Sequence, residues 1–111
     1  MSTIEEQFHL AMIDIYKRAK EECNYMASHL IQMINEVGGL GAAKRLLHSD
    51  FTVGFETLSR LERLDISMEA LILKPEWVGL FTDEERIIAK ERLSSHGFDV
   101  LQLLEPDNKN I

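Results

Sequence analysis

The sequence predicts an all-α fold, with one compact domain of five to six helices over residues 1–104 and a polar tail at 105–111. Three observations indicate this class. Apolar residues recur at intervals of three and four through most of the chain, which is typical of amphipathic helices. No stretch alternates apolar and polar residues over the length of a strand. Glycines, prolines and capping residues divide the later part of the chain into short segments.

The first element is the longest. An apolar stripe runs from Ile4 to Val37, and Ser2 or Thr3 can cap its start. A single helix of that length would extend about 50 Å, at 1.5 Å per residue. A domain of this size is too small to enclose it, so the helix either kinks or protrudes. Because asparagine favours caps and turns over helix interiors, we expect the break at Asn24.

Short helices follow the long one. Gly38 is placed to end it as a left-handed residue, and a helix over 41–49 can begin close by. Asp50 or Thr52 is a candidate cap for the next helix, which we expect over 55–64 from its apolar residues spaced by three.

The last third is divided by clearer signals. A helix over 68–73 ends before Pro75, which is suited to open a further turn. Thr82 and Glu85 have the spacing of a capping box at the start of the best-defined helix. Gly97 is placed to end that helix.

Composition and charge restrict the classes of function that the chain can have. The chain has 111 residues, a net charge of −7 and 45% apolar residues, which describes one globular domain. No run approaches the ~20 apolar residues of a membrane-spanning helix, and the first residues lack the features of a signal peptide. A single cysteine, Cys23, fits a reducing compartment. We therefore expect a cytoplasmic protein with no membrane partner, and the acidic charge makes nucleic acid an unfavourable partner.

The stretch "VGGLGAAKRLL" raises the question of a phosphate site. A phosphate-binding loop requires a preceding strand and a Gly-Lys-Ser/Thr sequence, and neither is present. A hinge between helices is the favoured interpretation. A weak anion site remains as an alternative, formed by free N–H groups near Gly39 and Gly41 with Lys44 and Arg45 beside them.

Arginine and aromatic residues supply further candidates. Arg60 and Arg63 belong to "SRLERLD", where the favoured interpretation is structural, with one arginine holding Asp65 or a helix carbonyl. The alternative is a contact with a nucleic acid or a protein partner. Trp77 follows Pro75 in a turn, and it either caps the core or anchors an interface.

Catalytic and metal-binding patterns are weak. The four histidines are scattered, and none has a second ligand at the spacing of a metal site, so we expect no metal and no cofactor. His48 and Asp50 are close in sequence, which leaves a small hydrolase-type enzyme as a further alternative.

The run from Tyr16 to Gly97 resembles a family of small bacterial helical proteins. The segments that carry the resemblance are "GGLGAAKRLL", "RLDISMEALIL" and "LFTDEE", in that order, and the likeness covers about three-quarters of the chain. The family occurs as stand-alone chains or as a module attached to larger proteins and has no agreed biochemical activity. The resemblance therefore implies a bacterial cytoplasmic helical domain and supplies no catalytic residues.

We predict a non-enzymatic interaction or accessory module that self-associates, as a homodimer. Apolar residues of the first helix, among them Met12 and Tyr16, cover more than one narrow stripe, and short helices leave part of that surface uncovered. The alternative from another class is an accessory nucleic-acid-binding factor of a mobile-element or defence system.

Overall fold

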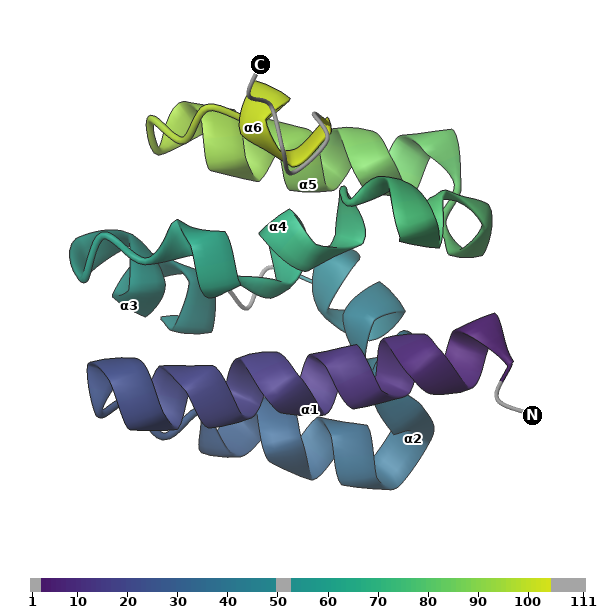
Figure 1. Ribbon diagram of the computed structural model, residues 1–111, viewed down its shortest axis with the longest axis horizontal. Coiled ribbons are helices and arrows are strands. Elements are labelled where there is room, and N and C mark those ends of the chain that lie inside the picture. The colour runs from purple at the N-terminus through teal and green to yellow at the C-terminus, as the bar shows by residue number, and fades with distance from the viewer. Residues whose placement is uncertain (1–2, 50–52, 105–111) are drawn as a thin grey trace, which may run out of the picture.

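The computed structural model describes residues 3–49 and 53–104, and this part of the chain is helical without strands. Six α-helices and two 3₁₀ turns form a single globule (Figure 1). In chain order these elements are α1 (Ile4–Cys23), α2 (Ser28–Leu47), α3 (Val53–Arg60), η1 (Leu64–Ile66), α4 (Met68–Ile72), η2 (Pro75–Leu80), α5 (Asp83–Ser95) and α6 (Leu101–Leu104). The expected caps Asp50 and Thr52 and the expected polar tail lie outside the described residues.

The elements form three levels (Figure 1). The long helices α1 and α2 lie side by side at one side of the molecule. The short elements α3, η1 and α4 occupy the middle. Helix α5, which contacts α4, lies on the far side together with α6. The short middle elements are therefore surrounded by longer helices, and the core forms around them.

The predicted break after the first helix is confirmed. Thr3 caps α1 through a capping box with Glu6, and α1 ends at Cys23. Asn24 has φ 54° and ψ 32°, the left-handed conformation that asparagine adopts more readily than other non-glycine residues. Residues 24–27 then form the connection to α2. The chain thus makes two helices of 20 residues each where a single helix would have outgrown the domain.

A second change of direction occurs at Gly38, within α2. Its φ of 82° and ψ of 165° lie outside the helical region, so α2 consists of two helical parts that meet at a kink. Glycine adopts this backbone without steric cost. The sequence predicted a stop and restart here, and the structure places it at this glycine.

The core contains large apolar side chains from every level. Its fully buried members include Phe8, Met12, Ile34, Leu47, Ile66, Ile72 and Leu93. Trp77 belongs to it as well, at 7% exposure, and contacts the Phe8 ring edge-on with 5.4 Å between ring centroids. Edge-on aromatic pairs of this kind add to the stabilisation from burial alone.

The caps predicted in the last third are present. Pro75 opens η2. Thr82 and Glu85 form the capping box of α5. The chain leaves α5 through Gly97, with φ 81°, and the Phe98 N–H donates to the Leu93 carbonyl at 3.0 Å. This hydrogen bond between residues five positions apart is typical of the Schellman motif at a helix C-terminus.

No helix in the described ranges combines the length and the apolar composition needed to cross a membrane.

Candidate binding pocket

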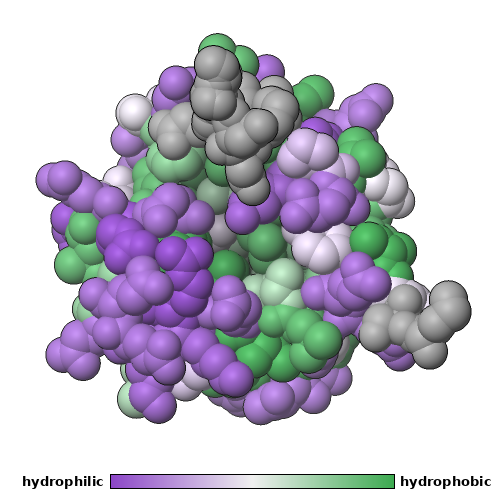
Figure 2. Space-filling model, in the orientation of Figure 1, coloured by the Kyte–Doolittle hydropathy of each residue, from purple (hydrophilic) through white to green (hydrophobic). Residues whose placement is uncertain are grey.

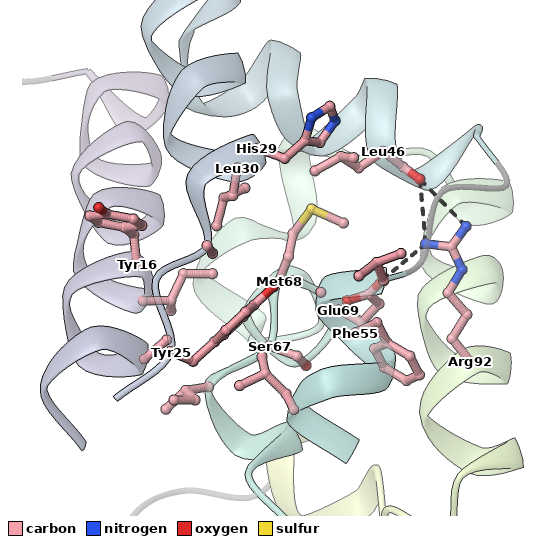
Figure 3. A pocket seen from close by; sticks show the side chains of 17 residues that line it. Tyr16, Tyr25, His29, Leu30, Leu46, Phe55, Ser67, Met68, Glu69 and Arg92 are labelled. Atoms are coloured by element: carbon pink, nitrogen blue, oxygen red, sulfur yellow. Dashed lines mark hydrogen bonds and ion pairs between the residues drawn. The ribbon is translucent and has the colours of Figure 1, made fainter. Parts of the chain in front are cut away.

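An apolar pocket of about 160 Å³ lies between the long helices and the short middle elements (Figure 3). The first pair of helices supplies one wall, and α3, η1, α4 and α5 supply the others. Apolar side chains dominate the lining, and they include Ile15, Leu30, Leu46, Phe55, Leu58 and Met68. Val53, which also lines the pocket, is 55% exposed, so the apolar lining continues to the surface.

Tyr25 reaches into this pocket from the connection between α1 and α2. Its backbone N–H donates to the Ala19 carbonyl at 3.0 Å, which ties the start of the connection to the end of α1. The ring extends as far as α3, because a Cβ atom built on Gly54 would lie 3.5 Å from the Tyr25 hydroxyl. Figure 3 shows the Tyr25 ring pointing into the pocket, whereas the Tyr16 hydroxyl points away from its centre.

A buried ion pair forms the far wall of the pocket. Arg92 Nη1 donates to Glu69 Oε2 at 2.9 Å, and the Glu69 side chain is 5% exposed (Figure 3). Burial raises the pKa of Glu69, and the hydrogen bond from Arg92 opposes that shift. Arg92 also donates to the carbonyls of Leu46, Leu47 and Ser49. One guanidinium thus neutralises the buried acid and satisfies carbonyls at the end of α2.

A second charged cluster surrounds Glu85, outside the pocket. Lys44 Nζ lies 2.7 Å from one carboxylate oxygen and His48 Nε2 lies 3.0 Å from the other. The Thr82 N–H also donates to this carboxylate, at 2.9 Å. Burial by itself would raise the pKa of Glu85, but the hydrogen bonds from Lys44, Thr82 and His48 outweigh it and lower the pKa to about 2. The cluster therefore joins α2 to α5.

Two groups of the candidate anion site, the Gly39 N–H and Lys44, are occupied by other contacts. The Gly39 N–H donates to His9 Nδ1 at 2.8 Å. Lys44 binds Glu85 and lies 5.0 Å from the centre of the Phe81 ring. Arg45 is exposed, and the hollow around Gly39 and Gly41 is also lined by Glu5 and Glu6. Lys44 and the Gly39 N–H thus each have a partner within the protein, and the weak anion site stays a prediction.

The two arginine candidates differ in their surroundings. Arg63 binds Asp65, as the structural interpretation expected, and it also reaches Glu22 on α1 at 2.7 Å. Arg60 is exposed and lies 3.5 Å from the Thr57 hydroxyl. Arg63 therefore already has two acidic partners, and contact with a nucleic acid stays a prediction.

Two candidate contact residues lie in the core instead of at the surface. Met12 is fully buried and Trp77 is 7% exposed, so in this conformation neither reaches a partner. For Trp77 the structure selects the core over the interface. Met12 was predicted to contact a partner, but the face of α1 that contains it is covered by the later elements. Tyr16 is half-buried at the pocket.

Of the two residues expected for a hydrolase, His48 and Asp50, the structure describes only His48. His48 contacts Glu85, a residue 37 positions away, and Asp50 lies outside the described residues. Within residues 3–49 and 53–104, no three His, Cys, Asp or Glu side chains are grouped as metal ligands would be.

The sequence did not single out Tyr25, Glu69 or Arg92. Arg92 has the pattern of an ordinary surface residue of α5, and its partners are 23 to 46 positions away. Glu69 carried one signal, because an acid within the apolar run "SMEALIL" is unusual and predicts a buried charge partner.

Comparison with protein-family models, curated proteins and solved structures finds no significant match to this chain.

Proposed function

We propose that the chain is a non-enzymatic interaction or accessory module that associates with a second copy of itself. The observation that supports the proposal is an apolar surface on the long helices. Figure 2 shows hydrophobic side chains gathered where α1 and α2 lie side by side, next to a strongly hydrophilic area. In these helices Leu10 is 61% exposed and Val37 is 37% exposed.

A symmetric dimer suits such a surface. In a two-fold dimer the same patch is buried on both subunits, so one apolar area covers its copy and no second kind of surface is needed. Ile13 follows Leu10 by three residues and therefore lies on the same side of α1. Further along the helix, Arg18 and Glu22 pair with each other at 3.0 Å, so charged groups adjoin the apolar area. An apolar centre with a polar rim is the usual composition of an interface.

Size-exclusion chromatography with light scattering tests this proposal. We expect the mass of a dimer at high micromolar concentration and dissociation on dilution. Leu10→Lys should shift the protein to the monomer, because it replaces an exposed apolar side chain of α1 with a charge. Ile87→Lys is the matched control, since Ile87 is 52% exposed but belongs to α5 and not to α1 or α2, and it should leave the mass unchanged. A monomeric parent chain at high concentration would overturn self-association.

A further inference from the structure

The pocket beside Tyr25 has the size of one small ring. Its volume is about 160 Å³. An engineered apolar cavity of about 150 Å³ takes up a molecule of benzene. The pocket therefore has room within it for a single six-membered ring with at most a small substituent.

The walls determine the charge of an occupant. Apart from His29, the lining has one acidic and one basic residue, Glu69 and Arg92, and they bind each other at 2.9 Å. Arg92 Nη2 donates to carbonyls at the end of α2. A charged ligand would lose its hydration in this pocket without gaining an unpaired counter-charge. The apolar surroundings thus favour a neutral molecule.

One polar group in the pocket remains available. The Ser67 hydroxyl is used twice, because it donates to the Leu64 carbonyl at 2.7 Å and accepts from the Ala70 N–H at 3.1 Å. The Tyr25 hydroxyl makes no hydrogen bond to another described residue, although it points into the pocket (Figure 3). A polar atom in a largely apolar pocket is best placed to orient a ligand through one hydrogen bond.

We infer that the pocket binds a neutral molecule built on a single aromatic ring that carries one hydroxyl group, with this hydroxyl bonded to Tyr25. The ring contacts Leu30 and the thioether of Met68, and sulfur–aromatic contacts of this kind are favourable. The site lies on the inner side of the first two helices and does not depend on self-association. Failure of one proposal therefore leaves the other in place.

An NMR titration with phenol and with benzene tests the inference on the full chain. We expect saturable shifts of the methyl groups of Leu30, Val53 and Met68, with dissociation constants of about millimolar because so small a ligand makes few contacts. Tyr25→Phe keeps the ring and deletes the hydroxyl. It should weaken phenol binding about fivefold, the usual effect of one lost hydrogen bond, and leave benzene binding unchanged.

Tyr16→Phe is the matched control, because this tyrosine also lines the pocket but its hydroxyl points away from the centre (Figure 3). It should change the affinity of neither probe. Two results would overturn the inference. The first is the absence of saturable shifts at these three methyl groups. The second is an equal loss of phenol and benzene affinity in Tyr25→Phe, with thermal unfolding confirming that the variant is folded.

Discussion

Gly39 lies at a close crossing of α1 and α2. A Cβ atom at this position would lie 2.6 Å from the His9 Cα atom, a backbone atom that cannot rotate away. The same crossing lets the Gly39 N–H donate to His9 Nδ1 at 2.8 Å. The absence of a side chain thus sets the distance between the two helices. The sequence predicted a hinge here because glycine pairs are common breakers, but the neighbour 30 residues away left no local signal.

Gly39→Ala should destabilise the protein by about 1–3 kcal/mol, the usual range for an overpacked contact, even though alanine is the better helix former by about 1 kcal/mol. Gly54→Ala is the matched control. Its Cβ atom would make only an ordinary contact with the Tyr25 hydroxyl, so this variant should be neutral or slightly stabilised. Urea unfolding followed by circular dichroism measures both. Equal stabilities for the two variants would show that the helices separate without cost.

Arg92 acts between elements, because it joins the end of α2 to α4 and α5. Arg92→Met should cost about 3–5 kcal/mol, since it leaves the buried Glu69 carboxylate without a partner. In the double variant Arg92→Met/Glu69→Met the buried charge is absent too. Part of the loss should then be recovered, because apolar residues of similar volume often replace a buried ion pair without cost.

The double variant should recover only part of the stability that Arg92→Met loses. Both variants remove the hydrogen bonds from Arg92 to the carbonyls of Leu46, Leu47 and Ser49. Glu69→Met alone keeps that donor, and comparison of the two single variants with the double variant isolates the contribution of the ion pair. Denaturant unfolding of the three variants completes the cycle. A single variant Arg92→Met as stable as the parent chain would contradict a structural role for the guanidinium.

At the level of elements, local signals were sufficient for some helix ends but not for all, because the helix expected over 55–64 runs from Val53 to Arg60. The capping box of Thr82 and Glu85 and the break at Asn24 depend on neighbours within a few residues, and both are confirmed. The same Glu85 also binds Lys44, 41 positions away, and no spacing rule predicts that contact. The pocket escaped prediction for this reason, because its lining comes from several elements brought together only by the fold.

Two carboxylates connect distant parts of the whole molecule and set its response to acid. Hydrogen bonds from Arg18 and Arg63 lower the pKa of Glu22 to about 2, and Glu85 is lowered to about 2 by its own cluster. A lowered pKa contributes stability above the unfolded value of 4.5 that is lost as the pH falls toward 2. Glu69 acts in the opposite sense. Its raised pKa favours the protonated carboxyl in the folded protein. The stabilisation from this shift is fully present below the unfolded pKa of 4.5, and it is lost as the pH rises through the folded-state pKa.

The thermal midpoint should therefore decrease as the pH is lowered from about 4.5 to 2, because Glu22 and Glu85 lose their stabilising contribution over this range, whereas Glu69 changes the stability only above pH 4.5. Glu85→Gln should lower the free energy of unfolding at neutral pH by about 1–3 kcal/mol, since it weakens the bonds to Lys44 and His48. It should also make the fall in acid shallower, because one of the titrating groups is gone. Glu84→Gln, at an exposed position in the same first turn of α5, should keep the full fall. Calorimetry across this pH range measures both variants, and an equally steep fall in Glu85→Gln would contradict the role of this cluster in holding α2 against α5.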